Sequence, residues 1–190
     1  MNKIIKISKW TITIIKILSV SIPLIVLFPW VFIDTVFIQG LLKDGFIAQP
    51  VLINESIGVV ELWKIQWTFL NKSIAVASDI ISMLPIYISL FILKSIFTSY
   101  TNGNIFTTDN AMRYKKLGSL FFVYGLIAQP LSQTVKILSL TIENDPGHRY
   151  LAFGFGTPNI EALFCGLIVF LVSLVMQEAS KINDENSYTV

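Results

Sequence analysis

Four long apolar stretches dominate the pattern of hydrophobic and polar positions along this chain, and short charged segments separate them. About 20 apolar residues in helical conformation cross the hydrocarbon core of a bilayer. The pattern therefore predicts four transmembrane helices, at about 11–35, 74–98, 108–138 and 159–182. The remaining residues form two longer connections, 36–73 and 139–158, and a short polar segment at mid-chain.

Both longer connections contain β-prone segments. In the second connection, Ser139–Ile142 and Tyr150–Phe155 flank the strong turn signal Asn-Asp-Pro-Gly at 144–147, which predicts a β-hairpin. A two-stranded hairpin alone is only marginally stable in water. We therefore expect this hairpin to pair with a strand from 36–73, so that the two connections form a small extracytoplasmic β-sheet cap.

Composition supports a membrane protein. The chain has 190 residues, of which 54% are hydrophobic and 14% are charged, and its mean hydropathy is +0.69. Soluble domains carry roughly a quarter charged residues. We therefore predict that 1–190 form a single four-helix membrane domain in a lipid bilayer. The net charge of +2 gives no reason to expect direct nucleic-acid binding. A single cysteine, Cys165, excludes an internal disulfide and a zinc site of the Cys/His type.

Positive charges gather at two places. The N-terminal segment carries Lys3, Lys6 and Lys9, and the mid-chain segment 97–118, here called the hinge, carries Arg113, Lys115 and Lys116. The two longer connections have fewer basic residues for their length, and acidic residues offset them. Lysine and arginine are enriched in cytoplasmic loops. We therefore expect both termini and the hinge in the cytoplasm, and the two connections on the outer side.

The hinge also carries helix-start signals. Gly103 and its asparagine neighbours suit a helix end, because both residue types tolerate left-handed backbone. Thr107 is predicted as the N-cap of a helix that starts at Thr108, with Asp109 in its first turn, where the helix dipole favours an acid. Two interpretations remain open. The hinge is a helix start with positive anchors, or it is a docking surface for a cytoplasmic partner.

The hinge sequence GNIFTTDNAMRYKKLG resembles the GxxFTxxNxxRxxxLG segment of a bacterial membrane protein family, domain of unknown function 2975 (DUF2975). The preceding SDIISMLPIYISLFILKSIFTSY is similar to that family's second helix, with a proline in the middle and an aromatic end. The C-terminal ALFCGLIVFLVSLVMQEASKINDENSYTV resembles its GLxxxxxxxVxxEAxxLxxENxxxV close, with Ile182 where the family often has leucine. The resemblance covers roughly 75–190.

The resemblance implies a multi-pass, four-helix protein of the bacterial cytoplasmic membrane without an established biochemical activity. Many members are encoded beside a small helix-turn-helix regulator, which implies such a regulator as a partner. The candidate docking surface joins the hinge to the acidic C-terminal segment and comprises Asn104, Phe106, Thr107, Asn110, Arg113, Lys115, Lys116, Glu178, Glu185 and Asn186. These opposite charges also fit an ordinary solvated surface or a latch that a partner opens.

A second candidate site, here called the polar cluster, comprises Asp79, Gln129, Gln133, Lys136 and Glu161. Gln129, Gln133 and Lys136 share one face of a helix by their spacing. On the predicted topology, Asp79, Lys136 and Glu161 lie at the outer ends of their helices. Ionisable groups at membrane helices are functional candidates and are usually paired. Three interpretations remain open: a ligand or ion site, a structural pair of Lys136 with Asp79 or Glu161, and plain interfacial exposure.

The sequence contains no HExxH, GxSxG or P-loop motif, so we expect no enzyme activity, no cofactor and no metal ligands. The function that fits best is an uncharacterised bacterial membrane protein with a regulatory or interaction role. A small transporter or ligand-binding bundle is an alternative, since prolines interrupt several apolar stretches. Transport by so short a chain would require a homo-oligomer. An immunity-type or structural membrane protein is a third possibility.

Overall fold

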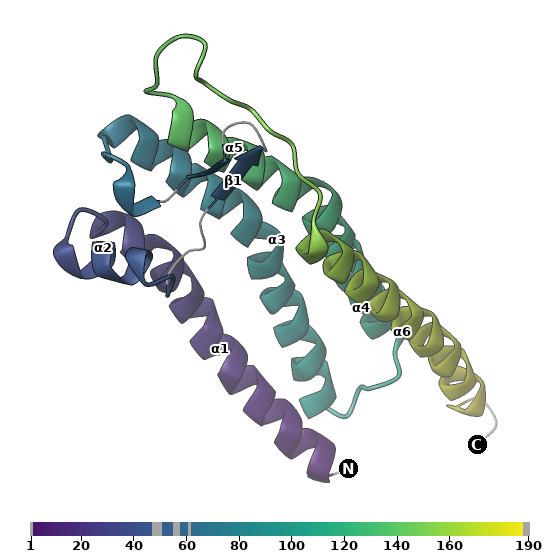
Figure 1. Ribbon diagram of the computed structural model, residues 1–190. Helices are drawn as coiled ribbons and strands as arrows, with labels where there is room; N and C mark the ends of the chain where they lie inside the picture. The colour runs from purple at the N-terminus through teal and green to yellow at the C-terminus, as the bar shows by residue number, and fades with distance from the viewer. Residues whose placement is uncertain (1, 47–50, 55–57, 61, 188–190) are drawn as a thin grey trace. The chain divides into compact units, whose positions relative to one another are not determined.

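The computed structural model describes residues 2–46, 51–54, 58–60 and 62–187, and the fold is mainly helical (Figure 1). The helices are α1 (Asn2–Val31), α2 (Val36–Lys43), α3 (Phe69–Thr101), α4 (Thr108–Val123), α5 (Gln129–Thr141) and α6 (Thr157–Ser187), with a 3-10 turn η1 (Leu62–Lys64) and a π-helical turn η2 (Tyr124–Ala128). All four predicted helical stretches are helical in the structure, although their ends differ from the predicted ones.

The first helix differs most. It begins at Asn2 rather than near residue 11, because the three N-terminal lysines have good helix propensity and do not interrupt it. It ends at Val31 rather than at 35, because Thr35 caps the short helix α2 instead. The Thr35 hydroxyl accepts a hydrogen bond from the backbone N–H of Ile38 at 3.4 Å.

Three helices are long and apolar enough to cross a membrane: Lys3–Val31, Phe69–Thr101 and Thr157–Asn183. Large apolar side chains on them remain exposed, among them Ile25, Phe91 and Val175. A soluble protein would bury surfaces of this extent, so these helices mark a membrane protein.

The fourth predicted span is helical but not uniform. Its helix begins at Thr108 as predicted, passes through the π-helical turn η2 and continues as α5 to Thr141. Pro130 lies at the start of α5 and lacks a backbone N–H, and π-helical turns absorb such breaks in the helical ladder. The separate pieces α4 and α5 are short, and this stretch is not among the three candidate spans.

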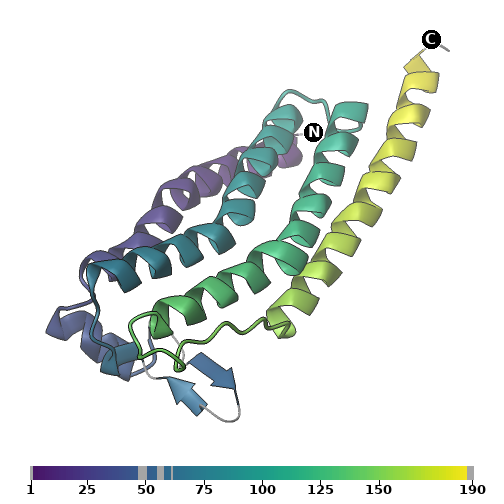
Figure 2. The ribbon, with the colours of Figure 1, turned by 90° about the horizontal axis from the view of Figure 1, so that it is seen from above.

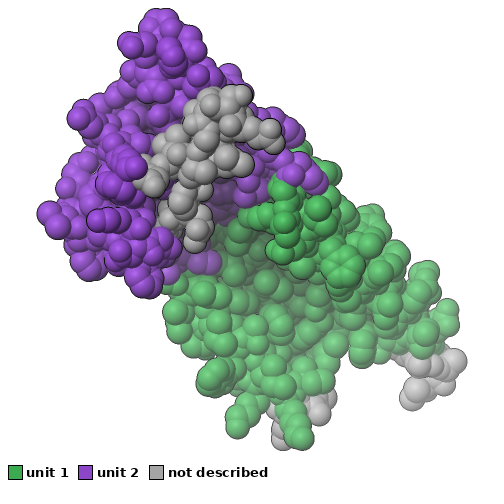
Figure 3. Space-filling model, viewed as in Figure 1, with its two compact units in different colours: residues 1–21, 84–127, 156–190 green, residues 22–83, 128–155 purple. Residues whose placement is uncertain are grey.

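The chain divides into two compact units (Figure 3): unit 1 comprises 1–21, 84–127 and 156–190, and unit 2 comprises 22–83 and 128–155. In unit 1, α4 packs along α6 (Figure 2). The buried residues of α6 recur at intervals of three, four and seven: Asn159, Ala162, Gly166, Ser173, Met176 and Ser180. This is the spacing of a close helix–helix seam.

Small residues let α4 and α6 approach closely. A Cβ atom on Gly118 would lie 3.1 Å from the carbonyl oxygen of Gly166. A Cβ atom on Gly125, at the π-helical turn that follows α4, would lie 2.9 Å from the carbonyl oxygen of Asn159. Instead, the Asn159 side-chain amide donates to the carbonyl oxygen of Gly125 at 2.7 Å. Backbone contact of this kind is typical of helix packing in membranes.

Unit 2 has an apolar core. Its buried residues are Ile33, Ile38, Leu42, Leu62 and Leu140, with Trp30, Leu41, Ile65 and Trp67 packed against them. This core ties α2 and η1 of the first connection to the end of α5. The parts of the first connection that form α2 and η1 are therefore packed into a core.

The predicted β-hairpin in the second connection is wrong. Among the described residues, the only sheet is two-stranded and lies in the first connection, where β1 (Val51–Asn54) pairs antiparallel with β2 (Gly58–Val60). Ser139–Thr141 belong to α5, and 148–156 have no regular structure. No strand of 36–73 pairs with 139–158 within the described parts of the chain.

The hydroxyl of Thr141 explains why this segment is a helix end and not the first strand of a hairpin. It donates to the carbonyl oxygen of Ile137 at 3.0 Å, which keeps Thr141 in the helix, and accepts from the backbone N–H of Tyr150 at 3.1 Å. The predicted turn itself is confirmed. The N–H of His148 donates to the carbonyl oxygen of Asp145 at 2.9 Å, and Gly147 has a φ of +96°. The turn therefore reverses the chain against a helix end rather than between two strands.

Candidate functional site

The hinge is organised around Asn110, whose side chain is fully buried. Its amide Nδ2 donates to the carbonyl oxygens of Asn104 and Ile105, at 2.7 and 3.0 Å. Its backbone N–H donates to the Thr107 hydroxyl at 3.2 Å, which confirms Thr107 as the N-cap of α4. Gly103 turns the chain just before this loop with a φ of +82°. One asparagine thus fixes the loop that joins α3 to α4.

Arg113 extends this network to α3. Its Nη1 donates to Asn110 Oδ1 at 2.9 Å and to the carbonyl oxygen of Ser95 at 3.4 Å. The hydroxyls of Tyr100 and Tyr114 meet at 2.9 Å and form a second link between the same two helices. Leu117 is buried and Gly118 contacts α6. The residues that carry the hinge motif therefore hold α3, α4 and α6 together.

Several other members of the candidate docking surface have exposed side chains. Lys115, Lys116 and Phe106 are exposed, as is the Asn104 side chain. Glu178 pairs within α6, where Lys181 Nζ lies 2.8 Å from its Oε1. Among the described contacts, no ion pair joins Glu178 to the hinge. The side chain of Glu185 is exposed, and that of Asn186 lies outside the described residues.

An open groove of about 550 Å³ lies beside the hinge in unit 1. One wall is a face of α3 that includes Lys94 and Thr98. The other wall is the loop and the first turns of α4, with Asp109 and Arg113. Three members of the candidate docking surface line this groove: Asn104, Thr107 and Arg113. The lining is polar and charged at the hinge end.

In unit 2, the structure brings together two members of the polar cluster. Lys136 Nζ lies 2.8 Å from Asp79 Oδ1, and Trp30 Nε1 donates to Asp79 Oδ2 at 2.7 Å. Both oxygens of the carboxylate are therefore occupied. The side chains of Lys136 and Asp79 are 29% and 20% exposed, so the pair is partly solvated.

Aromatic residues frame this pair. Lys136 Nζ lies 6.0 Å from the ring centroid of Trp30, and Trp30 meets Trp67 edge to face at 5.2 Å. Trp67 Nε1 donates to the carbonyl oxygen of Leu62 at 3.3 Å. The charged pair is thus tied through two indoles to the apolar core of unit 2.

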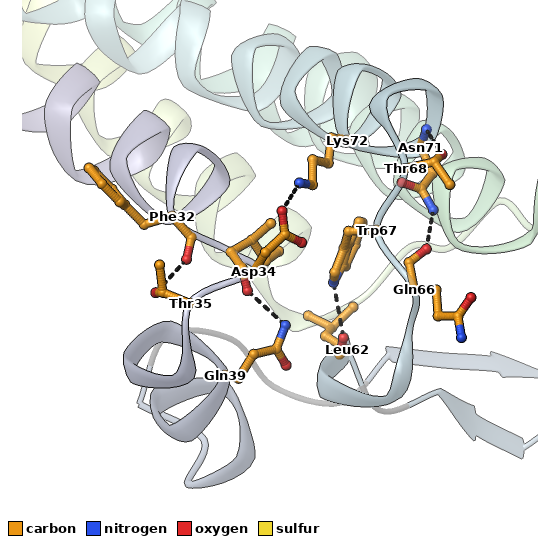
Figure 4. A network of polar contacts seen from close by, with 11 residues as sticks. Phe32, Asp34, Thr35, Gln39, Leu62, Gln66, Trp67, Thr68, Asn71 and Lys72 are labelled. Carbon is orange, nitrogen blue, oxygen red and sulfur yellow. Dashed lines mark hydrogen bonds and ion pairs between the residues drawn. The ribbon is translucent and has the colours of Figure 1, made fainter.

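Further polar contacts surround the same core (Figure 4). Lys72 pairs with Asp34, and the Gln39 side chain donates to the carbonyl oxygen of Ile33 at 2.7 Å. The buried Asn71 donates through Nδ2 to the carbonyl oxygen of Gln66 at 3.1 Å (Figure 4). The Thr68 hydroxyl donates to Oε1 of Glu143 in the second connection. The bond between Thr68 and Glu143 joins the two connections without a shared sheet.

Within unit 2, Gln129 and Gln133 do not bond to the pair. Gln133 Oε1 lies beside Gly154, where a Cβ atom would come within 2.8 Å of it. Gln129 is half-buried and makes no hydrogen bond through its side chain to a described residue. Glu161 is exposed and belongs to unit 1. Within the described residues, no group of three His, Cys, Asp or Glu side chains is placed to hold a metal ion.

Several residues that make long-range hydrogen bonds in unit 2 carry no signal in the sequence. The sequence predicts Trp30 only as part of an apolar span, but its indole N–H donates to Asp79, 49 positions along the chain. Ser78 and Ser132 are buried, and the Ser78 hydroxyl donates to the carbonyl oxygen of Ser132 at 2.8 Å. The small-residue spacing of α4 and α6 was a readable signal, because Gly118 and Gly125 are seven residues apart.

A family model described as "Protein of unknown function (DUF2975)" matches residues 48–190. No curated protein matches the chain, and no solved structure matches it.

Proposed function

The chain belongs to the DUF2975 family, and we propose that it is a regulatory membrane protein whose hinge binds a small cytoplasmic helix-turn-helix regulator. The observation that carries this proposal is the pair of exposed lysines, Lys115 and Lys116, on a helix start that buried hydrogen bonds hold in place. A fixed, charged surface loses little conformational entropy when a partner binds.

The proposal includes a topology. We propose that α4, η2 and α5 together form a fourth span in the bacterial cytoplasmic membrane, with both termini and the hinge in the cytoplasm. The stretch from Leu117 to Val135 carries no charge, and Lys116 and Lys136 bracket it. Such a stretch is long enough to cross a bilayer core as a helix. The basic hinge then faces the side on which lysine and arginine are retained.

Arg113 and Asn110 do not belong to the proposed contact surface, although the sequence suggested them. Both are engaged in the bonds that build the hinge. Reversing the charge of Arg113 would damage the hinge itself and would not report on docking alone. Lys115 and Lys116 offer the cleaner test because their side chains are exposed.

The test is co-purification of the full chain, in a mild detergent, with the helix-turn-helix regulator encoded at the same locus. We expect the wild-type chain to retain the regulator and the double variant Lys115→Glu, Lys116→Glu to retain at least about fivefold less, since a charge at a surface contributes on the order of 1 kcal/mol. Lys3→Glu is the matched control, because it reverses an exposed lysine elsewhere.

Two results would contradict this function. The first is a locus without such a regulator, or a wild-type chain that retains none. The second is equal retention by the double variant and by Lys3→Glu.

A further inference from the structure

We propose that the groove beside the hinge binds the phosphate group of an anionic phospholipid. The groove is not lined by Lys115 or Lys116, the two exposed lysines on which the regulator proposal rests. The phospholipid site also does not depend on which side of the membrane the hinge faces, since both leaflets carry phospholipid headgroups.

The groove follows one face of α3. Phe91, Lys94, Thr98 and Asn102 line it, and their spacings of three and four place them along the same side of a helix. Phe91 belongs to the apolar span and is 51% exposed, whereas Asn102 lies just beyond the last residue of α3. Polarity therefore rises along the groove from the apolar span to the helix end. A phospholipid has the same gradient, from acyl chain to headgroup.

Two cations line the groove with donors to spare. Lys94 is exposed, and within the described parts of the chain its ammonium makes no ion pair. Arg113 makes both of its hydrogen bonds through Nη1. Its Nη2 and Nε have no partner among the described residues, so one edge of the guanidinium is available. Planar guanidinium groups suit phosphate because they can donate two parallel hydrogen bonds.

Arg113 is also preorganised. Asn110 and the carbonyl oxygen of Ser95 hold its Nη1, so the side chain loses little rotamer freedom when an anion binds. Basic pockets between membrane helices are known to bind anionic headgroups. One feature opposes binding: Asp109 also lines the groove, and its carboxylate repels a phosphate. Removing the charge of Asp109 should therefore strengthen phospholipid binding, whereas removing the charge of Lys94 should weaken it.

The experiment measures lipid retention by native mass spectrometry on the full chain, purified in detergent and mixed with equal amounts of phosphatidylglycerol and phosphatidylcholine. We expect preferential retention of phosphatidylglycerol. Lys94→Gln should lower that preference about fivefold, and Asp109→Asn should raise it, because one surface charge contributes on the order of 1 kcal/mol. Lys9→Gln is the matched control, since it removes an exposed charge that does not line the groove, and it should leave the preference unchanged.

Three results would overturn the proposal. One is equal retention of the two lipids. Another is an equal loss in Lys94→Gln and Lys9→Gln, which would indicate general surface attraction. The third is displacement of phosphatidylglycerol by an equal concentration of inorganic phosphate, which would assign the groove to a soluble anion. The regulator test uses different residues, so failure of one proposal is distinguishable from failure of the other.

Discussion

The hinge and the Asp79–Lys136 pair are both polar sites next to long apolar helices, yet they are built from different chemistry. Asn110 is neutral, 0% exposed, and bonded to a loop on one side and to Arg113 on the other. Asp79 and Lys136 carry full charges and are 20% and 29% exposed. The first site is a closed network, and the second is a pair that water can reach.

This difference decides which site stabilises the fold more. Removing the Asn110 amide breaks three hydrogen bonds of a fully buried side chain, which water replaces poorly. A partly exposed ion pair that is broken leaves two groups that water can solvate, so its net contribution is small. The site with the formal charges is therefore the weaker of the two, although the sequence makes it the more conspicuous.

The largest effect is expected for Asn110→Ala. The substitution leaves the carbonyl oxygens of Asn104 and Ile105 without their shared donor, and it removes an acceptor of Arg113. We expect the free energy of unfolding to fall by about 3 kcal/mol, measured by denaturant titration in detergent. Asn104→Ala is the control, because its side chain is exposed, and it should change stability little. Equal losses in the two variants would contradict the closed network.

A smaller effect is expected at the seam with α6, to which the hinge is attached. In Gly125→Ala the new Cβ atom would meet the carbonyl oxygen of Asn159 at 2.9 Å, so the helices must shift. We expect a loss of about 2 kcal/mol in the free energy of unfolding. Gly40→Ala provides the comparison, since a Cβ atom there meets nothing within 4 Å. A Gly125→Ala variant as stable as Gly40→Ala would show that α6 can accommodate a methyl group next to Asn159, and would contradict the close approach described here.

The smallest effect is expected for the ion pair. Asp79→Asn keeps an acceptor for the Trp30 indole but loses the attraction to Lys136. We expect Asp79→Asn and Lys136→Met each to cost about 1 kcal/mol, and the double variant to cost less than their sum because the residues are in contact. Raising the salt concentration should reduce the loss. A cost for Asp79→Asn above that of Asn110→Ala would reverse the comparison.

The sequence predicted local features of the chain well and long-range contacts poorly. The start of α4 was predictable because Thr107 is a capping residue type and Asp109 follows it in the first turn. The extension of α5 was not, because Ser139–Thr141 are β-prone by residue type. Their place in the helix depends on bonds that the Thr141 hydroxyl makes to Ile137 and to Tyr150.

The same reasoning applies to the candidate site. Pairing of Asp79 with Lys136 was one of the interpretations that the charges allowed, and it is the pairing found. The contribution of Trp30 was not predictable, because no local pattern marks an indole whose partner lies 49 positions away. The role of Asn110 was hidden for another reason: a polar residue in a basic hinge suggests exposure, whereas this one is fully buried.

The most direct test of the proposed account is the side of the membrane on which the hinge and the second connection lie. In a Cys165→Ser background, Asn104→Cys and Asp145→Cys place one exposed thiol in each segment. We expect a membrane-impermeant maleimide to label Asp145→Cys in intact cells with a permeabilised outer envelope, and Asn104→Cys only in inverted membrane vesicles. Labelling of both positions from the same side would show that α4 and α5 do not cross the membrane, and would contradict the four-span arrangement.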